Sequence, residues 1–209
     1  MQDLSEENIR KNCPHCNAGH VALKFVLKET ENFRVVCDYN PLTEGHILII
    51  PKAHISCVGE MDDDHFFEFK ELYNHFSEFL KKEYRSIATF EHGKVGQTVF
   101  HCHVHLLPFE GNHFQIIPEG ESKLSIIGKI DKLKEEYRSK GKYLFLSIND
   151  KMWLVDTGLE VPRFFRDRFA KALGNPKRGN WKNIQENAEM RKELEKEINS
   201  LMEKYKKYE

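Results

Sequence analysis

Three histidines at alternate positions carry the clearest chemical signal in this sequence. His101, His103 and His105 lie in the run Gln-Thr-Val-Phe-His-Cys-His-Val-His-Leu-Leu-Pro at residues 97–108. The residues between the histidines are apolar, which favours a strand. Because side chains alternate between the two faces of a strand, we expect the three imidazoles on one face, about 6.6 Å apart in succession. Imidazoles act as nucleophiles, proton carriers or metal ligands near neutral pH, so the pattern predicts a catalytic or metal-binding row.

A second motif, Cys-Pro-His-Cys at residues 13–16, has the spacing with which two cysteines bind zinc. Two thiolates supply only half of a tetrahedral site, so histidines brought close by the fold would complete it, and His54 and His101 are the candidates. The alternative is that Cys13 and Cys16 are thiols in a turn without metal. The chain has five cysteines, an odd number, which favours reduced thiols over a disulfide framework.

The bulk properties narrow the class of protein. The chain has 209 residues, enough for one domain with an appendage, and its net charge of −1 offers no basic field for general nucleic-acid binding. Residues 1–7 are acidic and polar and lack the features of a secretory signal. No apolar stretch approaches the length of a membrane span. These features predict a cytoplasmic protein that does not enter the membrane.

The hydrophobic periodicity predicts the elements that hold these motifs. Strands are expected over 21–27, 33–37 and 46–50, a helix over 62–84, and paired strands over 87–90 and 98–107. Beyond residue 115 we expect a hairpin over 143–155, a helix over 162–173 and an amphipathic helix from Asn187. The apolar stripe of this last helix, packed on its own domain or on a partner subunit, comprises Met190, Leu194, Ile198, Leu201 and Tyr205.

Together, these motifs resemble the histidine triad (HIT) superfamily of nucleotide hydrolases and transferases. Residues 101–107 fit its signature of three histidines alternating with apolar residues, and Gly-Gln-Thr-Val at 96–99 resembles its lead-in. The run from Asp38 to His54 is similar to its second hallmark, and residues 13–16 resemble the N-terminal knuckle of zinc-containing members. The resemblance covers about residues 10–110.

The resemblance implies an α+β, HIT-like fold in which helices pack on an antiparallel sheet, usually in a homodimer. It implies a catalytic domain over residues 1–115, followed by a C-terminal extension over 116–209. By analogy with zinc-containing members, one structural zinc ion would be bound by Cys13, Cys16, His54 and His101.

The resemblance also implies a reaction. His103 would attack the α-phosphorus of a nucleotide substrate to form a covalent nucleotidyl-histidine, and His105 would manage the proton of the leaving group. The substrate would be a dinucleoside polyphosphate or an AMP conjugate. Asp38 would accept hydrogen bonds from ribose hydroxyls, His46 would border the phosphate site, and Gln97 and Thr98 would hold phosphate oxygens.

One departure from the family pattern concerns the segment before the histidines, where many relatives carry an asparagine. Glu91 or His92 stands in that region here, and His92 is either a phosphate contact or a turn residue. Several alternatives to a hydrolase remain open. They are a nucleotidyltransferase or phosphorylase using the same intermediate, a nucleotide-binding scaffold without activity, an enzyme repairing adenylylated nucleic-acid ends, and an unrelated enzyme whose three histidines bind a catalytic zinc ion.

Overall fold

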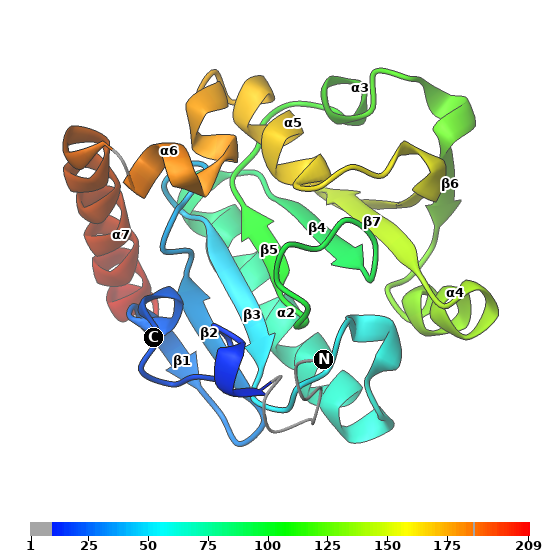
Figure 1. Cartoon of the computed structure of the whole chain (residues 1–209), viewed down its shortest axis with the longest axis horizontal. Coiled ribbons are helices and arrows are strands. Elements are labelled where there is room, and N and C mark those ends of the chain that lie inside the picture. The colour runs from blue at the N-terminus through cyan, green and yellow to red at the C-terminus, as the bar shows by residue number, and fades with distance from the viewer. Residues whose placement is uncertain (1–9, 186) are drawn as a thin grey trace, which may run out of the picture.

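The computed structural model describes residues 10–185 and 187–209, and its centre is an eight-stranded antiparallel sheet (Figure 1). The strand order is β1-β2-β3-β5-β4-β7-β8-β6. The strands are β1 (Val26–Glu29), β2 (Phe33–Cys37), β3 (Ile47–Pro51), β4 (Ala88–Gly93), β5 (Val104–Leu107), β6 (Leu124–Ile127), β7 (Tyr143–Ile148) and β8 (Lys151–Val155). The acidic segment 1–7 lies outside the described residues.

The α-helices are α2 (Asp63–Tyr84), α3 (His113–Ile116), α4 (Lys132–Lys140), α5 (Phe164–Ala172), α6 (Trp181–Gln185) and α7 (Ala188–Tyr208). Short 3-10 turns are η1 (Val21–Leu23), η2 (Val58–Glu60), η3 (Glu121–Lys123), η4 (Thr157–Leu159) and η5 (Pro176–Gly179). Among the described residues, no helix combines the length and the apolar character that a membrane crossing requires.

One face of the sheet is covered by α2, on which α7 packs. The N-cap of α2 is Asp62, whose side chain accepts the backbone N–H of His65, and its C-cap is Arg85 in the left-handed conformation. Tyr205 of α7 stacks on Phe76 of α2 with ring centroids 5.0 Å apart. Both long helices therefore confirm the sequence prediction, and the tail helix packs on its own chain.

The opposite face carries a second core beneath α5, where Phe90 of β4 stacks on Phe169 at 5.2 Å. The hairpin β7–β8 forms as predicted, and β7 pairs with β4, so the chain beyond residue 115 continues the same sheet.

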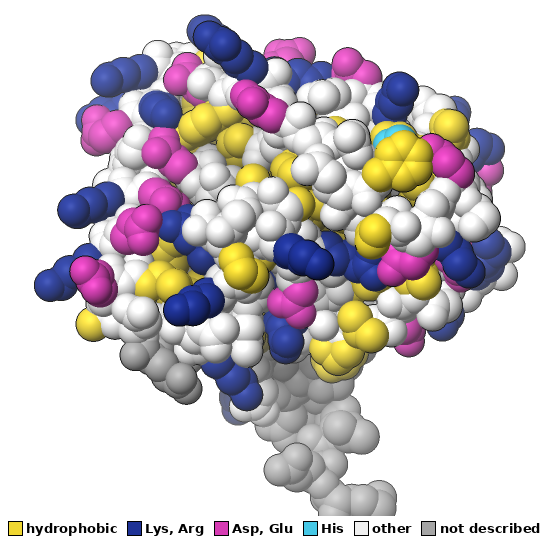
Figure 2. Space-filling view, turned by 90° about the horizontal axis from the view of Figure 1, so that it is seen from above, with side chains coloured by type: hydrophobic (Ala, Val, Ile, Leu, Met, Phe, Trp, Pro, Cys, Tyr) yellow, Lys and Arg dark blue, Asp and Glu magenta, His cyan; other side chains and the backbone are white. Residues whose placement is uncertain are grey.

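Seen from the side of α5 and α6, the surface carries positive side chains interspersed with negative ones (Figure 2). The domain boundary at residue 115 and the homodimer stay predictions.

Two predicted strands are wrong in extent. Residues 21–23 form η1, and β1 begins only at Val26. The predicted strand over 98–107 is reduced to β5, because Cys102 donates its N–H to the carbonyl of Ile55, 2.6 Å away in the loop after β3, instead of pairing with β4. The alternation of faces nevertheless begins before the strand, since Cys102 packs with Val104 and Leu106 in the core beneath α2.

Candidate functional site

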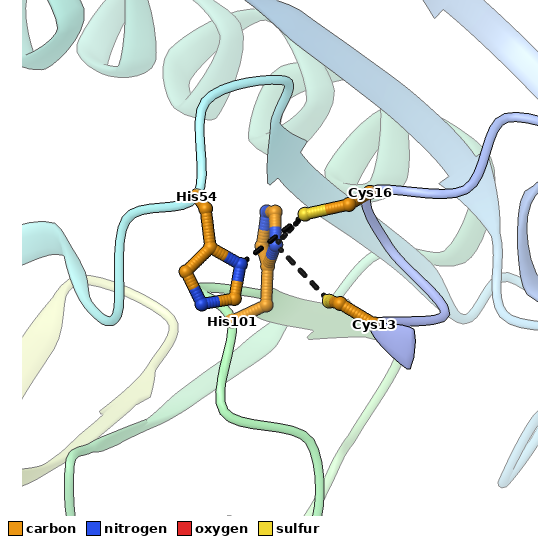
Figure 3. Close-up of side chains that lie close together, drawn as sticks. All are labelled: Cys13, Cys16, His54 and His101. Carbon is orange, nitrogen blue, oxygen red and sulfur yellow. Dashed lines mark hydrogen bonds between the residues drawn. The ribbon is translucent and has the colours of Figure 1, made fainter. Parts of the chain in front are cut away.

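Four side chains from three separate segments converge beside the start of the histidine row (Figure 3). One ligand atom from each of Cys13, Cys16, His54 and His101 lies within 4.8 Å of all the others. Sγ of Cys16 is 3.2 Å from Nδ1 of His54 and 3.4 Å from Nδ1 of His101, and Sγ of Cys13 is 3.5 Å from the latter. Sulfur and nitrogen ligands of one tetrahedral zinc ion are about 3.6 Å apart, given the usual zinc–ligand distances and the tetrahedral angle.

The orientation of His101 suits this donor set. Its Nε2–H donates to the carbonyl oxygen of Pro51 at 2.8 Å, so its Nδ1 carries the lone pair that faces the thiols. Burial and the neighbouring Cys13 raise the pKa of the Cys16 thiol to about 11 in the absence of a cation. A dication would reverse this effect because zinc binds the thiolate form. Two thiols and two imidazoles are a set that fits zinc.

The second histidine of the row is held in one tautomer by the backbone. Nδ1 of His103 donates to the carbonyl oxygen of His101 at 2.6 Å, so Nε2 carries the free lone pair. Burial lowers the pKa of His103, which favours the neutral imidazole. The side chain is half-buried and lines a cavity of about 380 Å³. His103 therefore presents a neutral nucleophilic nitrogen at a cavity of the size that small ligands occupy.

A chain of hydrogen bonds sets the tautomer of His105. The backbone N–H of Leu42 donates to Nδ1 of His46 at 3.1 Å, so Nε2 of His46 carries a proton. That nitrogen lies 2.9 Å from Nδ1 of His105, which must accept, and the proton of His105 is therefore on Nε2. Burial lowers the pKa of His46 to about 4 and that of His105 well below its ordinary value, consistent with two neutral rings.

Asp38 also lines the cavity, and a cation from a distant helix holds it in place. One carboxylate oxygen accepts the N–H of Asn40 at 2.8 Å, and the other accepts Nη1 of Arg166 at 2.6 Å. Burial acts to raise the pKa of Asp38, but Arg166 and His46 hold it below its ordinary value. The ligand atoms of Asp38, His46 and His105 are close enough to hold a metal, but the adjacent guanidinium disfavours a second cation there.

Of the four residues predicted to bind substrate, Asp38 and Thr98 line this cavity, whereas His46 and Gln97 do not. Thr98 lines it together with Asp38, His103 and His105. His46 is buried behind His105, and the amide nitrogen of Gln97 donates to the carbonyl oxygen of Ser56 at 2.9 Å. The phosphate contact of Gln97 stays a prediction.

Glu91 and His92, neighbours on β4, face opposite sides of the sheet. Glu91 is buried on the side of α2, away from the cavity. His92 stacks on Phe165 of α5 at 5.3 Å and accepts its backbone N–H through Nε2. Glu91 is therefore a core carboxyl, and His92 is a ring that packs on α5.

The residues at the cavity that were not predicted as site residues include His15, Arg166 and Trp181. His15 lies inside the cysteine knuckle and its ring is 5.0 Å from that of His103. Arg166 lies in the helix that the sequence predicts over 162–173, to which the sequence assigns no function. No sequence motif around Arg166 or Trp181 indicates a binding site, because each residue reaches the cavity only through the packing of α5 and α6.

Known proteins share part of the sequence of this chain. The HIT domain model matches residues 20–112. An uncharacterized HIT-like protein of Methanocaldococcus jannaschii is 33% identical over 109 residues, covering 50% of this chain and 83% of the relative. The adenosine 5′-monophosphoramidase HNT1 of Saccharomyces cerevisiae is 27% identical over 117 residues, which cover 56% of this chain and 73% of that relative. The crystal structure of a HIT-family member from Bacillus subtilis shares 29% identity, covering 48% of this chain and 75% of that one with a TM-score of 0.42. The chain belongs to the HIT family.

Proposed function

We propose that this protein hydrolyses nucleotides at the α-phosphate through a covalent intermediate on His103. The substrate is a dinucleoside polyphosphate or an AMP conjugate such as a phosphoramidate. The observation that carries the proposal is the 2.6 Å hydrogen bond from Nδ1 of His103 to the backbone, which leaves Nε2 unprotonated at the cavity. A scaffold that only binds nucleotides has no need of a nucleophile held in this way.

In the first step the lone pair of Nε2 of His103 forms a bond to the α-phosphorus, and the bond from phosphorus to the leaving atom breaks. The leaving atom takes the bonding electrons. Nε2–H of His105, whose ring centroid is 5.0 Å from that of His103, donates a hydrogen bond to it, and an amine leaving group takes its proton from water. In the second step water attacks phosphorus, the phosphorus–nitrogen bond returns its electrons to His103, and the attacking water releases its proton to the solvent. One water molecule is consumed for each nucleotide released.

Two further observations support this assignment. The relative from Saccharomyces cerevisiae is named for activity on adenosine 5′-monophosphoramidate, which favours AMP conjugates as substrates. The metal cluster has four protein donors, so it leaves no open position for substrate. A zinc ion bound there would tie the knuckle and the loop after β3 to His101, and thereby hold the segment that presents His103.

The test is a substrate panel with adenosine 5′-phosphoramidate and diadenosine polyphosphates. His103→Ala should abolish turnover while the fold and the zinc content persist, and mass spectrometry of the wild-type protein should detect one nucleotidyl group on His103. The matched control is His65→Ala at the start of α2, which should turn over normally. Full activity of His103→Ala would exclude the mechanism.

The same panel separates the alternatives. Turnover that requires added phosphate and releases a nucleoside diphosphate would identify a phosphorylase, and transfer to another acceptor a nucleotidyltransferase. Nucleotide binding without turnover of any substrate would identify a scaffold.

A further inference from the structure

The chain beyond residue 115 supplies part of the wall of the nucleotide cavity. Arg166 of α5 and Trp181 of α6 line the cavity together with His103 and Asp38. Both residues lie outside the segment 20–112 that matches the HIT domain. The part of the chain beyond the HIT domain therefore shares a cavity with His103.

Arg166 uses its guanidinium to hold the turn that carries Asp38. Nη1 donates to the Asp38 carboxylate at 2.6 Å, and Nη2 donates to the carbonyl oxygen of Asn40 at 2.7 Å. The side chains of Arg166 and Asp38 are only 12% and 8% exposed, so the pair is largely desolvated and its geometry is restricted. Each carboxylate oxygen has a second lone pair, which leaves Asp38 able to accept a hydroxyl of a ligand.

Trp181 supplies an aromatic surface at the same cavity. It is 36% exposed, although large apolar side chains in this fold are mostly buried. Val21 of η1, which is 49% exposed, lines the cavity as well. An accessible indole beside an aliphatic side chain is a surface on which a nucleobase stacks, whatever the base.

We propose that the C-terminal extension completes the nucleotide site. Trp181 is the wall against which the base stacks, and Arg166 is a positioning residue that holds Asp38 to receive the hydroxyls of the sugar. The inference rests on the proposed function and makes it more specific: the favoured substrates carry both a base and an intact ribose. One N–H of Nη1 and one N–H of Nη2 of Arg166 are bonded to Asp38 and Asn40, so the role assigned to Arg166 is to hold this turn and not to bind the phosphate.

The experiment measures binding of three probes by calorimetry: AMP, 2′,3′-dideoxy-AMP and ribose 5-phosphate. Trp181→Ala should weaken AMP binding by roughly tenfold or more, as loss of one stacked base does, and leave ribose 5-phosphate unchanged. Arg166→Gln should weaken AMP binding by about tenfold while dideoxy-AMP binding stays unchanged, because the lost contacts are those of the sugar hydroxyls.

Two matched controls exist. Arg168, on the same helix, bonds a carboxylate and a carbonyl in the same manner, with Glu119 and Ile116 as partners, and it does not line the cavity. Phe114 of α3 is another exposed aromatic side chain, 49% accessible, and it does not line the cavity. Arg168→Gln and Phe114→Ala should bind all three probes as the wild type does.

The outcomes separate this inference from the function on which it rests. A wild-type protein that binds no AMP would overturn the proposed function. A wild-type protein that binds AMP, together with a Trp181→Ala variant that binds it equally well, would overturn the stacking wall alone. Equal losses for AMP and dideoxy-AMP in Arg166→Gln would assign Arg166 to the phosphate instead of to Asp38.

A further pair of variants guards against a general folding defect. Arg166→Gln should have no additional effect on AMP binding in an Asp38→Asn background, since the proposed role passes entirely through Asp38. Arg166→Lys retains the charge and should recover part of the discrimination between AMP and dideoxy-AMP. If Arg166→Gln weakens AMP binding as much in the Asp38→Asn background as in the wild type, the positioning role is refuted.

Discussion

Replacement of Glu91 by glutamine should change the pH dependence of stability. Glu91 is 1% exposed, and its carboxyl accepts the N–H of Val58 at 2.8 Å and the hydroxyl of Tyr143 at 2.6 Å. The thiol of Cys102 lies 3.4 Å from the same carboxyl. Cys102 stands between His101 and His103, so Glu91 supports the histidine segment from the core side of the sheet.

The size of this pH effect on the free energy of unfolding follows from the protonation of Glu91. Burial raises its pKa from 4.5 to about 7, although the hydrogen bonds from Tyr143 and Val58 act in the opposite direction. Between these two values the folded state keeps the proton and the unfolded state has lost it. The free energy of unfolding therefore falls by about 1.4 kcal/mol for each pH unit over this window, and by about 3 kcal/mol in total.

Glutamine has nearly the same shape as glutamic acid and stays neutral, so Glu91→Gln should lack this loss of stability. Urea unfolding of both proteins from about pH 5 to about pH 8 gives the difference in their free energies, in which the contributions of all other groups cancel. The variant should gain roughly 3 kcal/mol relative to the wild type as the pH rises across this range. The control, Glu110→Gln on the surface, should give a difference that is constant with pH. A constant difference for Glu91→Gln would refute the assignment of a protonated core carboxyl.

Three other perturbations test the zinc cluster, the hydrogen-bond chain and the packing of the tail. Cys16→Ser should reduce the zinc content from about one ion per chain, measured by elemental analysis, and a variant that keeps its zinc would contradict the Cys₂His₂ site. His46→Ala should cost about 2–5 kcal/mol in denaturant unfolding because it leaves the Leu42 N–H and Nδ1 of His105 unpaired; an unchanged midpoint would argue against the chain. Ile198→Ala should cost about 2–4 kcal/mol, since this residue of α7 is 2% exposed; a loss below about 1 kcal/mol would show that α7 packs loosely.

Local patterns predicted the elements that repeat with a simple period. The apolar stripe of α7 could be read from its spacing because a helix places every third and fourth residue on one face. The absence of a strand over 98–103 could not be read from the sequence, because an apolar run does not show which neighbour its backbone groups will bond. Here Cys102 bonds the loop after β3, so the segment from 98 to 103 stays outside the sheet.

The candidate site shows the same division. The spacing of Cys13 and Cys16 predicted a metal knuckle from the sequence, with His54 and His101 as the candidates to complete it. The fold brings the ligand atoms of all four residues together. The side to which Glu91 points depended on the register of β4 in the sheet, which no local pattern reveals.

The sequence by itself determined the chemistry that is available: a row of imidazoles, a pair of thiols and an apolar frame to hold them. The tertiary structure decided how those groups are used. Hydrogen bonds to the carbonyl of His101 and to the N–H of Leu42 select the tautomers of His103 and His105. The ion pair of Asp38 with Arg166 joins residues 128 positions apart. Sequence periodicity records which face a side chain takes within its own element, whereas these contacts depend on how distant elements pack against each other.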